Sequence, residues 1–330
     1  MNREDQQLSA AYLKNERFEY VISTLNEALF EKQDMLLENK GDIFPTIHIL
    51  GAPRSGTTLA SQLISSCLKV GYINNFIATF WKAPLYGIEL SKKLLGLDYI
   101  SSFKSDYGRT DSIKEPHEFG YFWNYHLKYQ NLEQKESRHE EAIDWKTLSN
   151  VLNNMGYAFN RPVVFKSFLF GFHAKKAWEE MPKTCYIYVK RDYLENALSI
   201  LKLRKELNND INVWGSIKPK QYAILKNLSV HEQIAGQILC LENEYLSQLE
   251  SIPERNKLLL NYSDICNNPN FFLNQVAAMI TNHDKTFEGT VSSISPFHQQ
   301  QQLPTTDDAK LFIEAKESIK TLFPGLLLLK

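Results

Sequence analysis

The 330-residue sequence has no excess of either charge, because 37 lysines and arginines balance 38 aspartates and glutamates and leave a formal net charge of −1. Such a balance provides no overall field that would attract nucleic acid or an anionic membrane. The cysteines are few and lack metal-ligand spacing, and Cys67 and Cys185 fall in apolar segments where a small buried thiol is expected. We therefore expect no nucleic-acid partner and no metal, and any anion-binding site must be local.

Long apolar runs are also absent. No segment approaches the ~18 apolar residues of a membrane-spanning helix, and the C-terminal stretch GLLLLK is far too short. The opening stretch, MNREDQQLSAAYLKNE, contains neither an apolar signal core nor a basic leader. The sequence therefore predicts a cytoplasmic protein without a transmembrane segment.

Four short apolar segments are typical of buried strands. They are TIHIL (46–50), PVVF (162–165), CYIYV (185–189) and KLLLN (257–261). Helical patterns lie between or after them, at 58–67, 144–155, 173–181, 194–207, 230–250, 268–280 and 307–323. This alternation predicts an α/β fold in which a parallel β-sheet carries helices on both faces.

No linker rich in proline, glycine or serine divides the chain, which predicts a single domain over residues 1–330. Residues 1–42 would form an N-terminal helical extension, whose amphipathic helix suits its own core or a second subunit equally well. Residues 74–135 would form an aromatic-rich insertion. Ordinary core packing and an acceptor-binding pocket at the strand ends both explain those aromatic residues.

The segment ILGAPRSGTTLASQLI (49–64) places a glycine-rich loop between a predicted strand and a predicted helix. Gly51 and Gly56 permit a tight turn whose N–H groups converge on an anion at the helix N-terminus. A nucleoside triphosphate site requires lysine after the second glycine, but Thr57 stands there, and no predicted strand ends in a bare aspartate for magnesium. The loop therefore favours a phosphate bound by side chains instead of metal. The candidate residues are Arg54, Ser55, Gly56, Thr57 and Thr58.

A second candidate phosphate contact lies in YIYVKRDYLENALSI (186–200). Arg191 ends a predicted strand, and Ser199 follows eight residues later on the next predicted helix. Both side chains could approach one phosphate at the carboxyl edge of the sheet. An ion pair between Arg191 and Asp192 is the alternative interpretation.

Together these motifs resemble the sulfotransferases that use 3′-phosphoadenosine 5′-phosphosulfate (PAPS). GAPRSGTT is similar to their 5′-phosphosulfate loop, the Arg191–Ser199 segment to their 3′-phosphate segment, and LLLNYSDICNNPNFFLNQVAAMI (258–280) to the block that follows. The three blocks occur in family order from Ile47 to Ile280. The resemblance implies a P-loop-like fold, PAPS as co-substrate and adenosine 3′,5′-bisphosphate as product.

Two further segments resemble catalytic segments of this family. VVFKSFLF (163–170) is similar to Lys-Thr-His-Leu-Pro, which implies Lys166 near the transferred group but leaves a phenylalanine where that pattern has its catalytic histidine. SIKEPHEF (112–119) resembles the Lys-Glu-x-His-Phe-Phe segment of heparan-sulfate-type enzymes. It implies Glu115 as the base, with Lys114 near the phosphosulfate and His117 assisting. Glu118 is the alternative base, and a solvated charge cluster at a helix start is the alternative to a catalytic role.

The predicted activity is metal-free, in-line transfer of a sulfuryl group from PAPS to the hydroxyl of a small-molecule or saccharide acceptor. The glutamate-containing segment and the aromatic insertion favour a carbohydrate, because sugars stack on aromatic rings. A P-loop kinase-like phosphotransferase and a catalytically inactive nucleotide-binding protein are the alternatives.

Overall fold

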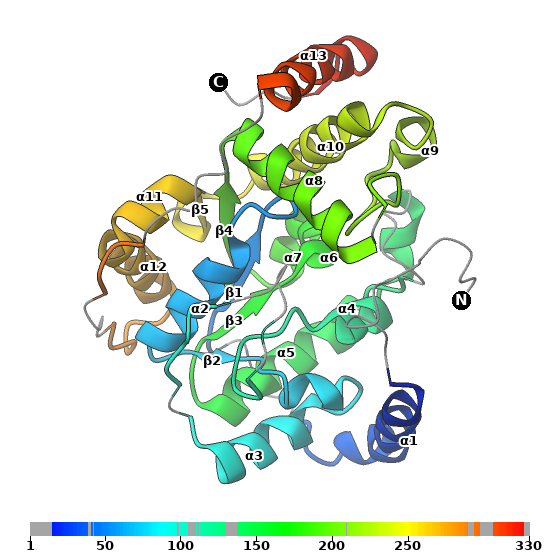
Figure 1. Ribbon diagram of the computed structural model, residues 1–330. Coiled ribbons are helices and arrows are strands. Elements are labelled where there is room, and N and C mark those ends of the chain that lie inside the picture. The colour runs from blue at the N-terminus through cyan, green and yellow to red at the C-terminus, as the bar shows by residue number, and fades with distance from the viewer. Residues whose placement is uncertain are drawn as a thin grey trace.

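A computed structural model of the chain describes residues 15–38, 41, 43–97, 99–104, 110, 112–129, 137–208, 210–289, 294–297 and 306–326. Its centre is a five-stranded, fully parallel sheet with the order β2-β3-β1-β4-β5 (Figure 1). The strands are β1 (Thr46–Leu50), β2 (Gly71–Tyr72), β3 (Val163–Lys166), β4 (Cys185–Lys190) and β5 (Lys257–Asn261). The predicted α/β class is confirmed.

Helices cover both faces of this sheet, as predicted. Ile47, Ile49 and Ile187 face α2 (Thr57–Cys67) and α12 (Pro269–His283), whereas Phe165 and Tyr186 face the opposite layer. That layer contains α4 (Gly120–His126), α5 (Trp145–Phe159), α6 (Phe168–Gly171), α7 (Ala174–Glu180) and α10 (Val230–Glu250) (Figure 1). The remaining helices are α1 (Glu16–Gln33), η2 (Ile77–Phe80), α3 (Pro84–Leu95), η3 (Ser137–Ala142), α8 (Tyr193–Asn208), α9 (Tyr222–Leu225), η4 (Glu254–Asn256), α11 (Tyr262–Asn267) and α13 (Thr306–Leu322).

Local sequence signals fix several helix ends. Asp144 caps α5 by accepting a hydrogen bond from the N–H of Thr147, and Asn160 ends that helix in the left-handed conformation. Ser229 and Glu232 form a reciprocal capping box at the start of α10. These signals explain why the predicted and observed helices agree closely.

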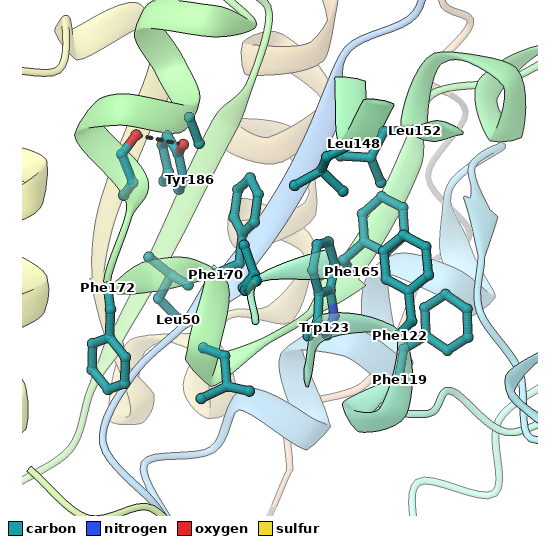
Figure 2. Close-up of a cluster of buried hydrophobic side chains, with 14 of the residues drawn as sticks. Leu50, Phe119, Phe122, Trp123, Leu148, Leu152, Phe165, Phe170, Phe172 and Tyr186 are labelled. Carbon is teal, nitrogen blue, oxygen red and sulfur yellow. Dashed lines mark hydrogen bonds between the residues drawn. The ribbon is translucent and has the colours of Figure 1, made fainter. Parts of the chain in front are cut away.

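The larger hydrophobic core lies between the sheet and the α5 layer. Trp123 packs with its ring centre 5.5 Å from that of Phe165 and 5.0 Å from that of Phe170 (Figure 2). Phe119 and Phe122 stack at 4.5 Å beside them. These three aromatic residues of the 74–135 segment are almost completely buried, so core packing is their role.

The N-terminal helix α1 docks onto the same segment through two buried amides. Asn26 donates to the carbonyl of Thr79 and accepts from the N–H of Lys82, both at 2.7 Å. Gln33, two turns later, bonds backbone groups of Lys82 and Leu85. Each amide satisfies backbone groups that would otherwise be buried without a partner. Residues 1–14, 39, 40 and 42 of the predicted extension lie outside the described residues.

Candidate functional site

The topology gathers the predicted site residues at one edge of the sheet. All strands are parallel, so their carboxyl ends share that edge, and β3, β1 and β4 are neighbours in it. The chain leaves β1 toward β2 on one side and later returns to β4 on the other, which creates a topological switch point beside β1. Ligands of open α/β sheets bind at such a point.

The loop from Gly51 to Gly56 is folded tightly upon itself. A Cβ at Gly51 would lie 2.4 Å from Oγ of Ser55 and 2.6 Å from the carbonyl oxygen of Val189. Gly56 has φ = 104° and immediately precedes Thr57, the first residue of α2. The Ser55 hydroxyl is buried inside the loop and has no hydrogen-bond partner among the described residues. A buried hydroxyl beside the helix N-terminus suits an anionic ligand, so the loop fits a phosphate group.

One cationic cluster lies on the β4 side of this loop and joins the two predicted phosphate segments. Nε of Arg54 donates to Oγ of Ser199 at 3.2 Å, and Nη1 of Arg191 donates to the carbonyl oxygen of Arg54 at 3.1 Å. Ser199 is buried on α8. The guanidinium groups of Arg54 and Arg191 therefore lie together on this side of the loop instead of facing separate clefts.

Three neighbours position this cationic cluster. The ring of Tyr262 lies 4.9 Å from Cζ of Arg191, and it also occupies the space where Gly56 would carry a Cβ, 2.1 Å from the ring. Glu195 accepts from Nε of Arg191 at 3.3 Å, whereas Asp192 caps the N–H of Glu195. The partner of Arg191 is therefore Glu195 and not the adjacent Asp192.

A second cluster lies on the β3 side. Nζ of Lys166 donates to Oγ1 of Thr58 at 2.7 Å and lies 2.6 Å from Oε1 of Glu118. The lysine side chain is 4% exposed, whereas that of Glu118 is 41% exposed. A buried ammonium thus links the first turn of α2 to a carboxylate that solvent or a substrate can reach.

Glu115 occupies a different environment. Its residue is 2% exposed, and its carboxylate accepts from Nε2 of Gln62 at 2.8 Å and from the N–H and hydroxyl of Ser102 at 3.2 Å. These bonds tie the 101–104 segment to α2. The Glu115 carboxylate is therefore held in place by neutral donors.

Lys114 and His117 flank Glu115. The Lys114 carbonyl accepts from the hydroxyl of Tyr72 at 3.0 Å. Nδ1 of His117 accepts from the N–H of Phe119 at 2.8 Å. Desolvation lowers the pKa of His117, with Glu118 opposing and Lys166 reinforcing this effect. His117 is therefore neutral at neutral pH and close to the electrostatic field of the Lys166 pair.

The structure brings two contacts into this site that the motifs did not assign. Tyr262 was visible as the tyrosine of the Tyr-x-Asp block, but its packing against Gly56 and Arg191 requires the fold. Asn196 donates from Nδ2 to the carbonyl oxygen of Pro53 at 2.8 Å and fixes the loop to α8. Its position three residues before Ser199 was the only available signal.

Three solved structures that match this chain are sulfotransferases. Sulfotransferase STF9 from Mycobacterium avium matches with a TM-score of 0.55 and 14% identity, over 90% of this chain and 80% of that chain. Sulfotransferase STF1 from Mycobacterium tuberculosis H37Rv matches with a TM-score of 0.49 and 13% identity, over 94% and 84% of the two chains. The sulfotransferase domain from the curacin biosynthetic pathway gives 0.40 and 13%, over 88% and 94%.

No protein-family model and no curated protein matches the chain. The likeness to STF9 shows that the chain has the fold of a sulfotransferase, which is the fold implied by its motifs. Among the described residues, no helix is long and apolar enough to cross a membrane. The same part of the chain contains no group of three or more histidine, cysteine, aspartate or glutamate residues arranged to hold a metal ion.

Proposed function

We propose that the protein is a PAPS-dependent sulfotransferase that transfers a sulfuryl group to an acceptor hydroxyl. The observation that carries this proposal is the pair of clusters on the two sides of one phosphate-type loop. Arg54, Arg191 and Ser199 form the first, and Thr58, Lys166 and Glu118 form the second. The sulfotransferase fold supports the same reaction class.

The β4-side cluster would bind the 3′-phosphate of the nucleotide. Two guanidinium groups and a buried hydroxyl provide charge and hydrogen-bond donors for a dianionic group. The loop N–H groups with Ser55, Thr57 and Thr58 would hold the 5′-phosphate at the start of α2. Arg54 contacts Ser199 directly, so we assign it to the 3′-phosphate as well as to the loop.

PAPS, when bound, supplies the sulfuryl group. Lys166 would stabilise negative charge that develops at the phosphate end of the breaking bond, because its buried ammonium lies beside Thr58 of the loop. The geometry favours Glu118 over Glu115 as the base. Glu118 adjoins Lys166 and is accessible, whereas the Glu115 carboxylate is enclosed by neutral donors. Once the ammonium interacts with the donor, the Glu118 carboxylate is free to take the hydroxyl proton.

The acceptor class is a carbohydrate or another small alcohol. Trp81, Tyr121 and Tyr125 leave ring surface outside the main core, with ring centres 5.8 Å apart in both Trp81 pairs. Tyr121 lies at the start of α4, three residues after Glu118 in the chain. Partly exposed aromatic rings on this segment suit stacking against a sugar.

The experiment that tests the proposal uses the full chain, radiolabelled PAPS and a panel of sugars, phenols and lipid alcohols, with EDTA present. Transfer of label that requires PAPS supports a sulfotransferase. A parallel arm contains magnesium and ATP labelled at the γ-phosphate; transfer of that label, stopped by EDTA, would instead identify the kinase-like phosphotransferase. Tight binding of adenosine 3′,5′-bisphosphate without transfer to any acceptor would identify an inactive nucleotide-binding protein.

A further inference from the structure

Arg204 is a buried cation whose bonding is incomplete. It lies on α8 with 0% exposure, and its Nη1 donates to Oε1 of Gln233 at 2.8 Å and to the carbonyl oxygen of Ile211 at 3.4 Å. Nε and Nη2 are buried and have no hydrogen-bond partner among the described residues. No carboxylate of that part of the chain pairs with this guanidinium.

The two unpaired nitrogens share one edge of the planar guanidinium group. Nε–H and one N–H of Nη2 point in parallel from that edge, which is the geometry that binds both oxygens of a carboxylate, sulfate or phosphate. A buried charge without a counter-ion is strongly unfavourable. Burial lowers the pKa of Arg204 only to about 10, so the group remains cationic at neutral pH. The fold therefore maintains a positive charge and a bidentate donor edge in its interior.

The surroundings form an aromatic and amide enclosure. The ring of Trp214 lies 4.9 Å from Cζ of Arg204, and Tyr222 packs edge-on against Trp214 at 4.9 Å. Gln237 lies one helical turn after Gln233 on α10, and its Oε1 is also buried without a hydrogen-bond partner among the described residues. The Trp214 ring covers one face of the guanidinium group, and Gln233 fixes its orientation.

The 215–217 segment is held against this enclosure. Nε2 of Gln237 donates to the carbonyl oxygens of Gly215 and Ile217, both at 2.8 Å. The neighbouring Ser216 has φ = 67°, a left-handed conformation that a non-glycine residue adopts at a cost. This anchored segment lies beside the Arg204 side chain, with a Cβ at Gly215 falling 3.8 Å from Cγ of Arg204.

We infer that Arg204 is the centre of an oxyanion-binding site, in which the Nε and Nη2 edge takes a carboxylate, sulfate or phosphate group of a small ligand. The site is separate from the candidate nucleotide site. Arg204 follows Ser199 by five residues on α8, which corresponds to a rise of roughly 7.5 Å and a rotation of roughly 140°. The inference rests on the Arg204 environment and does not depend on the proposed sulfotransferase activity.

The location test is crystallographic. The full chain is purified and crystallised with sodium selenate, and in a parallel arm with 4-bromobenzoate, each with adenosine 3′,5′-bisphosphate present. In at least one arm we expect an anomalous peak beside Arg204, with oxygens of the bound anion within hydrogen-bonding distance of Nε and Nη2. Selenate alone would indicate a tetrahedral oxyanion, and 4-bromobenzoate alone a carboxylate. An ordered water at that edge in both arms would overturn the inference.

The solution test compares three proteins by thermal unfolding in sulfate, acetate and chloride at matched ionic strength. Saturation of the site at about ten times the dissociation constant should raise the unfolding temperature of the wild type by about 2 °C over chloride. Arg204→Gln should lose this increment. Arg17→Gln, which removes an exposed arginine of α1, should retain it. If Arg204→Gln fails to fold, Arg204→Lys keeps the charge without the fork and should lose most of the increment. An equal increment in the wild type and the Arg204 variant would contradict the site.

Discussion

The contact between Gly56 and Tyr262 provides a quantitative test of the loop geometry. Gly56→Ala forces an alanine into φ = 104° and places its Cβ 2.1 Å from the Tyr262 ring. The backbone strain costs about 1–3 kcal/mol, and the overpacking costs about another 1–3 kcal/mol. The expected loss in the free energy of unfolding is therefore about 2–6 kcal/mol.

The two contributions separate in a double-mutant cycle. In a Tyr262→Ala background the clash disappears and only the backbone strain remains, so Gly56→Ala should cost about 1–3 kcal/mol there. Urea unfolding of the four proteins measures the coupling free energy, which we expect to be about 1–3 kcal/mol. A cost of Gly56→Ala that is the same in both backgrounds, within about 0.5 kcal/mol, would refute the packing described for this loop.

Three further predictions concern the base, the core and the N-terminal helix. Glu118→Gln should lower turnover by about 10²–10⁴-fold with little change in the affinity for adenosine 3′,5′-bisphosphate. Glu115→Gln should instead lower stability and leave the turnover of the folded protein nearly unchanged. The reverse pattern would make Glu115 the base. His48 is fully buried, and desolvation holds its pKa well below 6.5. Below pH 6.5 only the unfolded state gains this proton, so His48 should contribute a loss of about 1.4 kcal/mol of stability per pH unit. Desolvation also lowers the pKa of His117 and His126, so His48→Phe should remove the His48 share of the wild-type loss, and an unchanged pH profile in urea unfolding would contradict it. Asn26→Ala should lower the free energy of unfolding by about 2–4 kcal/mol, because it leaves two backbone groups of the 79–82 segment unpaired. A loss below about 1 kcal/mol would show that α1 is not docked through this amide.

The sequence predicted the sheet well because its strands are short apolar runs with clear boundaries. Each of the four predicted strands lies within one residue of an observed one. β2 was missed because it contains only Gly71 and Tyr72, a length at which no hydrophobic period exists. Its pairing depends on β3 being beside it, which is tertiary information.

The clustering of the candidate residues was predictable at the level of segments but not of individual contacts. The glycine loop, Arg191 and Ser199 were recognisable because their pattern depends on local spacing along the chain. The different surroundings of Glu115 and Glu118 were not predictable, since both carboxylates lie in one charged segment. Gln62 and Ser102, which enclose Glu115, come from distant positions that only the fold brings together.

The burial of Arg204 was not predictable from the local sequence. Within LENALSILKLRKEL it is typical of a solvent-facing helical charge. The structure buries it because α8 packs against α10, and Trp214 covers its guanidinium. No periodicity in the segment distinguishes this arginine from its neighbour Lys205, which is exposed.

Isothermal titration calorimetry with two nucleotides tests most directly whether the Arg191 cluster and the Lys166 cluster bind opposite ends of one nucleotide. The wild type, Arg191→Ala and the exposed-arginine control Arg17→Ala are titrated with adenosine 3′,5′-bisphosphate and with 5′-AMP. Loss of a charged hydrogen bond worth about 1.5–3 kcal/mol predicts a fall of about 10–150-fold in bisphosphate affinity for Arg191→Ala, with 5′-AMP affinity nearly unchanged and the control like the wild type. Equal losses for both nucleotides would contradict the assignment of this arginine to the 3′-phosphate.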